Sequence, residues 1–210
     1  MNSSRRASSV LGDMAASMNR TLRAHGLPEH PAEAYRAFVG EGLRRLVERA
    51  MPPGTDEARR DAFMADYQAD YAVHSLDETR LFPGIPAVLD ALERAAVPVA
   101  VLSNKLEGAT RQLVDALCSR WTFRETMGER PGVPRKPDPT SALYLADALG
   151  APPERVTLVG DTQVDVLTAR AAGMRPVGVL WGFRPAEVLA SGVEAASTGE
   201  ELAALLGLAG

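Results

Sequence analysis

The spacing of hydrophobic and polar positions changes near residue 80. Before that point, apolar residues recur at helical intervals and are interrupted by glycine and proline, while no convincing strand pattern is present. The helices predicted from this spacing cover residues 10–25, 31–38, 42–50 and 55–73. The first part of the chain is therefore predicted to be all-helical.

Beyond residue 80, short continuous apolar runs alternate with helical patterns. The runs predict strands over 97–102, 155–159 and 175–180. The helical patterns cover 85–96, 108–120, 141–150, 163–173, 185–190 and 198–206, and the proline- and charge-rich segment 129–139 is predicted to be a loop. Such alternation implies an α/β fold with a parallel sheet and right-handed crossovers. The preceding helical block is either a separate domain or a cap inserted into the α/β core.

Composition narrows the class of protein. The chain has 210 residues, of which 46% are hydrophobic and 24% charged, and a net charge of −4 with scattered lysine and arginine, so no nucleic-acid partner is expected. The single cysteine, Cys118, excludes an internal disulfide and a multi-cysteine metal centre, and it fits a reducing cytoplasm. No apolar run is long enough for a membrane span, so no membrane partner is expected either.

Two carboxylates follow the predicted strand 155–159. Asp161 and Asp165 are four residues apart, at the point where the strand gives way to a helix. Ligands of open α/β sheets bind at this edge, and two carboxylates suit a hard cation such as Mg²⁺. The same stretch also fits an ordinary helix start with Asp161 or Thr162 as the N-cap. The stretch alone leaves both interpretations open.

Complementary polar residues follow another strand and lie in the predicted loop. Ser103 and Asn104 come directly after the run 97–102, and Lys136 lies in the loop. A hydroxyl and free backbone N–H groups bind phosphate oxygens, and a lysine neutralises a transferring phosphoryl group. Individually, Ser103 is more often a capping residue and Lys136 a solvated lysine. Their order and spacing are more specific than any one of them.

In these elements the chain resembles the haloacid dehalogenase superfamily, and within it the phosphoglycolate phosphatases with a helical cap. Ser103, Lys136 and Gly160-Asp161-Thr162-x-x-Asp165 match the second, third and fourth motifs of that superfamily, and further likeness extends from about residue 11 to the C-terminus. The resemblance implies a Rossmann-like parallel sheet with an inserted all-helical cap. Residues 13–79 would form the cap and 80–210 the α/β core.

The resemblance also implies roles for the individual residues. Asp161 would be a direct Mg²⁺ ligand, and Asp165 would support the metal or its waters. Ser103 would donate a hydrogen bond to phosphate, Asn104 would contribute its backbone N–H, and Lys136 would bridge phosphate and nucleophile. The substrate would be a small phosphorylated metabolite, and the protein a monomer or homodimer.

Two arginines of the helical block are weaker candidates. Arg44 or Arg45 could meet a carboxylate of the substrate. A solvated helix face is the better expectation for both.

The first motif of the superfamily, Asp-x-Asp-Gly-Thr, does not occur in this sequence. Counting back from residues 13–19, it should fall on 2–6, with Asn2 at the position of the nucleophile and Ser4 at that of the acid/base. An amide is not a usable nucleophile, and serine cannot replace a carboxylic acid as proton donor. Residues 1–12 are thus expected to diverge from the family, the first central strand to be missing, and turnover to be slight or absent.

Two functions remain as expectations. The first is a Mg²⁺-dependent phosphatase of the phosphoglycolate phosphatase kind that acts through an aspartyl-phosphate when the first motif is present. The alternative is a non-catalytic phosphate- and Mg²⁺-binding protein, or a truncated gene product whose assigned start is wrong. Dehalogenase and mutase chemistry are less favoured, because Gly-Asp-Thr-x-x-Asp is the metal-binding form of the fourth motif and the cap and 181–183 look more like the phosphatases.

Overall fold

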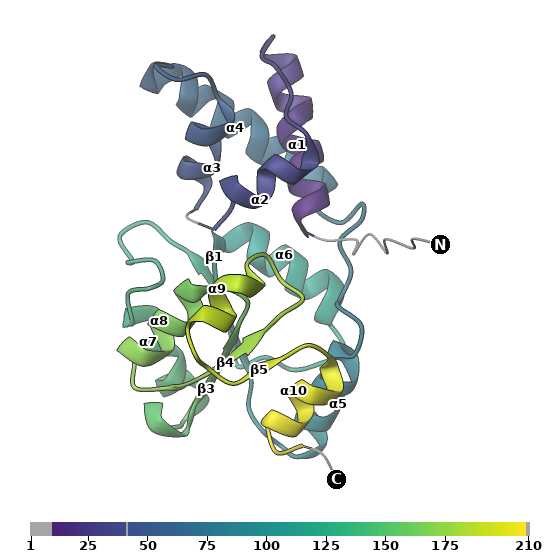
Figure 1. Ribbon diagram of the computed structural model, residues 1–210, viewed down its shortest axis with the longest axis vertical. Helices are drawn as coiled ribbons and strands as arrows, with labels where there is room; N and C mark the ends of the chain where they lie inside the picture. Colours follow the sequence, from purple (N-terminus) through teal and green to yellow (C-terminus); the bar gives the residue numbers. More distant parts are fainter. Residues whose placement is uncertain (1–9, 41, 209–210) are drawn as a thin grey trace. The chain divides into compact units, whose positions relative to one another are not determined.

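A computed structural model describes residues 10–40 and 42–208 of the chain (Figure 1). The chain forms two compact units, Met1–Arg80 and Leu81–Gly210, and each is considered by itself. The first unit is helical in its described part. The second alternates strands with helices.

The helical unit contains four α-helices among its described residues. They are α1 (Val10–Ala24), α2 (Tyr35–Phe38), α3 (Leu43–Ala50) and α4 (Glu57–His74), with a 3₁₀ turn η1 (Ala32–Ala34) before α2. The predicted helices 10–25, 42–50 and 55–73 are confirmed to within two residues. The predicted helix 31–38 is instead the 3₁₀ turn followed by a single turn of α-helix.

Packing of α1 against α4 builds the core of this unit. Met18 and Leu22 of α1 and Phe63 of α4 are fully buried. Beside them, Arg20 donates from Nε and Nη2 to the carboxylate of Asp70, at 2.9 and 2.7 Å. A two-pronged contact of this kind fixes the relative rotation of the two helices more firmly than a single bond would.

A buried carboxylate fastens the start of α1 to the chain that follows α4. Asp13 is 2% exposed and accepts the backbone N–H groups of Glu78 and Thr79, both at 2.9 Å. The hydroxyl of Thr79 donates to the same carboxylate at 2.6 Å. The two ends of the helical unit are therefore held side by side by hydrogen bonds to one side chain.

The α/β unit begins at α5 and alternates almost strictly. Its helices are α5 (Ile85–Arg94), α6 (Glu107–Cys118), α7 (Thr140–Leu149), α8 (Gln163–Ala171), α9 (Pro185–Ala190) and α10 (Gly199–Leu205), with a 3₁₀ turn η2 (Pro153–Arg155). Its strands are β1 (Ala100–Leu106), β2 (Glu125–Glu129), β3 (Thr157–Gly160), β4 (Arg175–Val179) and β5 (Ala195–Ala196). The predicted α/β class is confirmed, while β2 and β5 were not predicted.

The predicted strand 97–102 is displaced along the chain. Val97 donates its N–H to Leu92 at 2.9 Å and follows Ala96, whose φ is 53°, so these residues close the end of α5. The strand β1 begins only at Ala100 and continues through Ser103 and Asn104, where the sequence pattern predicted its end. An apolar residue in a helix C-cap is indistinguishable by hydrophobicity from one in a strand.

All the strand pairs in the described part of the chain are parallel, as predicted. They form two hydrogen-bonded groups, β1–β2 and β3–β4–β5. Among the described residues, β1 pairs only with β2, and β3 pairs only with β4 and with no strand on its other side. Within the described residues, β1 and β3 are therefore not hydrogen-bonded to each other.

Helices cover the strands with two apolar clusters. One cluster joins α5 and α10 to β4 and β5 through Val88, Val177, Val179, Ala196 and Leu202. The other joins α7 and α8 and is reached by Leu102 of β1 and Leu158 of β3. Figure 1 shows α5 and α10 together at one end of this unit and α7 and α8 on another side. Strands β1 and β3 therefore share one helical support.

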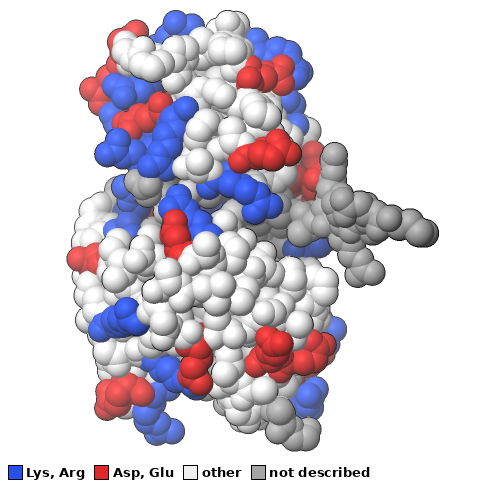
Figure 2. All heavy atoms as spheres, in the orientation of Figure 1, with Lys and Arg blue, Asp and Glu red and all other residues white. Residues whose placement is uncertain are grey.

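Acidic and basic side chains are interspersed on the visible face of each unit (Figure 2). Within the part of the chain that the structure describes, no helix combines the length and the apolar character that a membrane span requires.

Candidate functional site

A buried ion pair lies where the loop 130–139 meets the start of α8. The ammonium Nζ of Lys136 is 2.7 Å from Oδ1 of Asp165, and the two side chains are only 11% and 9% exposed. The same ammonium donates to the backbone carbonyl of Leu102 in β1 at 3.0 Å. Lys136 is therefore not a solvated loop lysine, because its charge is held between two elements of the α/β unit.

The second oxygen of Asp165 caps the helix. Oδ2 accepts the backbone N–H of Thr162 at 3.1 Å and its hydroxyl at 2.8 Å, which completes a capping box at the start of α8. Sequence left open whether Asp161 or Thr162 caps this helix. In the structure, Thr162 and Asp165 cap the helix, and Asp161 takes no part in the capping.

Asp161 lies at the end of β3 and is held by a backbone donor from another loop. Its Oδ2 accepts the N–H of Phe183 at 2.9 Å. Burial raises the pKa of this carboxyl, and the negative charge of Asp165 adds to the rise, whereas the Phe183 N–H and the charge of Lys136 oppose it. No ion pair to Asp161 occurs among residues 10–40 and 42–208. A partly buried carboxylate without a paired cation is a suitable ligand for a metal ion.

Two glycines leave the space that these carboxylates occupy. A Cβ on Gly182 would lie 2.1 Å from Oδ2 of Asp161, and one on Gly160 would lie 2.1 Å from Cβ of Asp165. Trp181, next to the first of them, stacks on Phe82 with ring centroids 4.6 Å apart. Residues 181–183 were noted in the sequence only for their resemblance to the phosphatases, so the close approach of Gly182 to Asp161 was not predicted.

Ser103 and Asn104 lie inside β1. The hydroxyl oxygen of Ser103 accepts the backbone N–H of Lys105 at 3.1 Å. The side chain of Asn104 donates from Nδ2 to the carbonyl of Lys136 at 3.0 Å and accepts the Lys136 N–H on Oδ1, also at 3.0 Å. Hydrogen bonds thus join Asn104 to Lys136 and Lys136 to Asp165. Ser103 precedes Asn104 in β1, and the charges of Lys136 and Asp165 act on Asp161, so the five residues lie in one region of the α/β unit.

The two candidate arginines of the helical unit are engaged elsewhere. Arg44 donates to Glu57 at 2.5 Å, a contact that raises the pKa of its guanidinium, and Arg45 donates to Glu48 at 2.8 Å. Both arginines are exposed on α3, and Glu57 is the first residue of α4. The solvated helix face is thus the interpretation that the geometry favours.

The residues present fit a magnesium ion with few protein ligands. Among the described residues, no group of three or more His, Cys, Asp or Glu side chains could hold a metal. Magnesium is usually bound through one or two carboxylates together with waters and substrate phosphate. Asp161 offers such a carboxylate, whereas both oxygens of Asp165 already accept hydrogen bonds. Asn2 and Ser4, predicted for the positions of the nucleophile and the acid/base, lie outside the described residues.

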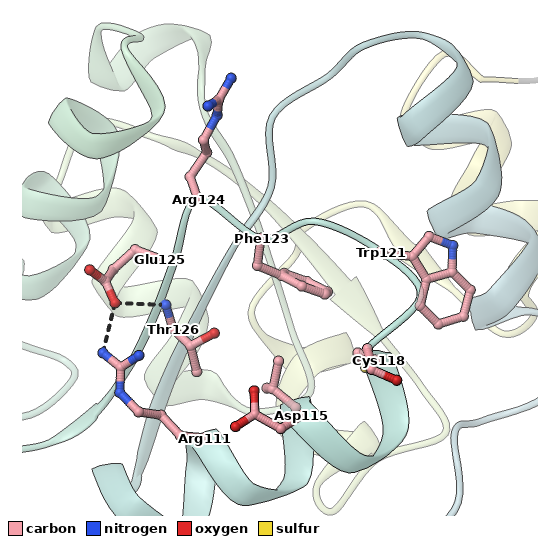
Figure 3. Close-up of a pocket in the computed structure, with 10 residues that line it drawn as sticks. Arg111, Asp115, Cys118, Trp121, Phe123, Arg124, Glu125 and Thr126 are labelled. Atoms are coloured by element: carbon pink, nitrogen blue, oxygen red, sulfur yellow. Dashed lines mark hydrogen bonds and ion pairs between the residues drawn. The ribbon is translucent and has the colours of Figure 1, made fainter.

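A separate pocket of about 540 Å³ lies between α6 and β2 (Figure 3). Cys118, Trp121 and Arg124 are among the residues that line it, and burial raises the pKa of the Cys118 thiol. Arg111 crosses one side and donates to Glu125 at 2.8 Å. The lining includes none of the five site residues, so this pocket is not the site described above.

Comparison with known proteins identifies the family. The family model of haloacid dehalogenase-like hydrolases matches residues 12–179. The chain belongs to the haloacid dehalogenase-like hydrolase family, and with this the hydrolase class expected from the sequence is confirmed.

The relatives found by sequence comparison have more specific names than the family model. A phosphoglycolate phosphatase of Aquifex aeolicus is 31% identical over 175 residues, which is 81% of this chain and 78% of the relative. One from Rhodospirillum rubrum is 32% identical over 180 residues, 82% of this chain and 75% of the relative.

Solved structures agree on the fold. A protein from Lactobacillus delbrueckii subsp. bulgaricus assigned as a phosphoglycolate phosphatase superposes with a TM-score of 0.83 at 26% identity, over 92% of this chain and 90% of that one. A haloacid dehalogenase-like hydrolase of Streptococcus pneumoniae superposes with a TM-score of 0.82 at 21% identity, over 94% and 91% of the two chains. At 21% identity, the second similarity shows only a shared fold.

Proposed function

We propose that this protein is built as a Mg²⁺-dependent phosphomonoesterase for small phosphorylated metabolites, with phosphoglycolate as the first substrate to test. The observation that carries the proposal is the ammonium of Lys136, buried 2.7 Å from Asp165 and hydrogen-bonded to Leu102 of β1, beside a second carboxylate at Asp161. A fixed cation beside carboxylates is an arrangement that stabilises a phosphoryl group. The phosphoglycolate phosphatases among the relatives supply the choice of substrate.

Each residue has a separate task in this proposal. The hydroxyl of Ser103 and the backbone N–H of Asn104, both within β1, hydrogen-bond phosphate oxygens, and Lys136 balances the phosphate charge. Asp161 is the protein ligand that would hold Mg²⁺, while Asp165 orients Lys136 and the waters of the metal. The ion, when bound, would polarise the phosphoryl oxygens and lower the cost of the charge that develops on them.

The two units would divide the work between them. Residues 80–210 would form the catalytic core, and residues 13–79 would act as the cap that selects the substrate. The proposed setting is the reducing cytoplasm, in keeping with a single cysteine in the sequence.

Turnover would require a carboxylate nucleophile, which Asn2 does not provide. The direct test compares the 210-residue chain with a chimera in which residues 1–9 are replaced by the N-terminal segment of the Aquifex aeolicus relative. Phosphate release from 2-phosphoglycolate in the presence of Mg²⁺ is measured for both. Activity in the chimera alone is the expected result. Equal activity in both chains would overturn the assignment of the nucleophile.

A non-catalytic role in binding phosphate and metal is the second candidate. It is favoured by one observation, the asparagine at position 2 of the sequence, because an amide neither attacks phosphorus nor adds charge to a metal site. Calorimetric titration with Mg²⁺ and inorganic phosphate distinguishes it. Binding by a chain that releases no phosphate, together with an inactive chimera, would support this second function over the first.

A further inference from the structure

The carboxamide of Asn104 pairs with the backbone of Lys136 on both sides. It donates to the Lys136 carbonyl and accepts the Lys136 N–H, each at 3.0 Å, although the two residues are 32 positions apart. A peptide group on a neighbouring strand would pair with a residue in the same way. Asn104 therefore supplies a strand-like partner to a residue that lies in a loop.

Lys136 needs such support because its own side chain is flexible. A lysine carries four methylene groups and loses considerable rotamer freedom when its ammonium is fixed. Its loop is held by two ion pairs, Arg130 with Glu107 at its start and, next to Lys136, Arg135 with Glu129 at 3.5 Å. Neither pair includes Lys136 itself. A fixed backbone narrows the range of positions open to the ammonium and so favours its contacts with Leu102 and Asp165.

We infer that Asn104 is a positioning residue, whose side chain fixes the backbone of Lys136 and thereby the place of its ammonium in the phosphate site. This role is distinct from the backbone N–H that Asn104 would offer to phosphate. The inference rests on the proposed function in one respect: the position of the ammonium matters because the ammonium is proposed to contact phosphate.

Two variants and one matched control test the inference. Asn104→Ala removes both hydrogen bonds, and Asn104→Asp keeps the shape and the acceptor but sets a carboxylate oxygen against the Lys136 carbonyl. The control is Asn19→Ala in the helical unit. The Asn19 carboxamide brackets His30 in the same manner, with bonds of 2.8 and 3.1 Å. This control removes an equivalent clamp from the other unit of the chain.

The readout is the ammonium signal of Lys136 in lysine-labelled protein. Lys105 and Lys136 are the two lysines of the chain, so the nitrogen spectrum holds two side-chain signals, and Lys105→Arg assigns them. Ammonium protons are visible when hydrogen bonds and burial slow their exchange with water. We expect the Lys136 signal in the wild type and in Asn19→Ala, and its loss in both Asn104 variants.

A second readout uses inorganic phosphate in the presence of Mg²⁺. If the ammonium is displaced, its charge-assisted contact with phosphate is lost, and we expect the affinity of Asn104→Ala to fall about tenfold while that of Asn19→Ala stays unchanged. Wild-type protein that shows the protected Lys136 signal but binds no phosphate would contradict the proposed function and leave the positioning role in place.

Three results would overturn the inference. One is a Lys136 signal that persists in Asn104→Ala. Another is the same loss of signal in Asn19→Ala, which would mean that general loosening is the cause. The third is a wild-type protein without a protected Lys136 signal, because no fixed ammonium would then exist.

Discussion

The exchange Asp165→Asn tests whether the buried ion pair is a structural element as well as a part of the site. Asparagine has nearly the size of aspartate, so no cavity arises. The carboxylate accepts hydrogen bonds from Lys136 and from the N–H and hydroxyl of Thr162, at 2.7, 3.1 and 2.8 Å. An amide has one oxygen, so at least one of these donors must face its NH₂ group.

The expected cost follows from these contacts. If the amide oxygen stays on Lys136, the backbone N–H of Thr162 loses its acceptor, which costs about 1–3 kcal/mol. The ammonium of Lys136, 11% exposed, also loses its counter-charge, and breaking a buried pair from one side costs about 3–5 kcal/mol. The two costs overlap, so we expect a loss of about 4 kcal/mol in the free energy of unfolding. With a urea m-value of about 2 kcal/mol/M, the midpoint should fall by about 2 M.

The assay is urea unfolding followed by tryptophan fluorescence. Both tryptophans of the chain, Trp121 and Trp181, belong to the α/β unit, so their emission reports the unit that contains the pair. The matched control is Asp147→Asn on the exposed surface of α7, for which a change within about 0.5 kcal/mol is expected.

A second substitution separates charge from shape. Lys136→Met in the Asp165→Asn background removes the uncompensated ammonium, so part of the lost stability should return. The reasoning is refuted if Asp165→Asn unfolds at the same urea concentration as Asp147→Asn, or if removal of Lys136 deepens the loss by its full single-mutant effect.

Further expectations concern Asp13, Gly182 and Asp161. Asp13→Ala leaves three donors without their buried acceptor and should cost the helical unit about 3 kcal/mol or more, measured by circular dichroism during urea unfolding. Gly182→Ala should cost about 1–3 kcal/mol because its Cβ would meet Asp161 at 2.1 Å, whereas Gly108→Ala, with open space around it, should be neutral or stabilising. Asp161 has a raised pKa, so the folded chain holds this proton more tightly and loses stability as pH rises from about 4 through the folded pKa. Asp161→Asn should therefore be more stable than the wild type at pH 7, with the difference vanishing below about pH 4, and a constant difference would contradict this.

The regular elements could be predicted because their patterns are local. Helical spacing located α1, α3 and α4, and the apolar run before Gly160 located β3. The strand β2 was missed because Glu-Thr-Met-Gly-Glu has no apolar run. Packing against α6 favours glycine at position 128, because a Cβ there would lie 2.4 Å from Cα of Glu107. Such a constraint leaves no trace in hydrophobic spacing.

The candidate residues could be found in the sequence, but their contacts could not. Lys136 and Asp165 were selected by motif, yet their ion pair depends on how a loop folds back against α8. The pairing of Asn104 with Lys136 depends on the same fold-back. Asp13 was not singled out in the sequence, because its buried partners lie more than sixty positions away. Long-range partners of polar groups are set by the tertiary structure.

The binding of inorganic phosphate in the presence of Mg²⁺ tests the central claim most directly. Titration calorimetry compares the wild type with Lys136→Met and with Arg155→Met, which removes an exposed positive charge ahead of β3. We predict binding by the wild type and by Arg155→Met, and affinity at least about tenfold lower in Lys136→Met. Equal affinity in Lys136→Met, or no binding by wild-type chain whose tryptophan fluorescence shows it to be folded, would contradict a phosphate site at Lys136.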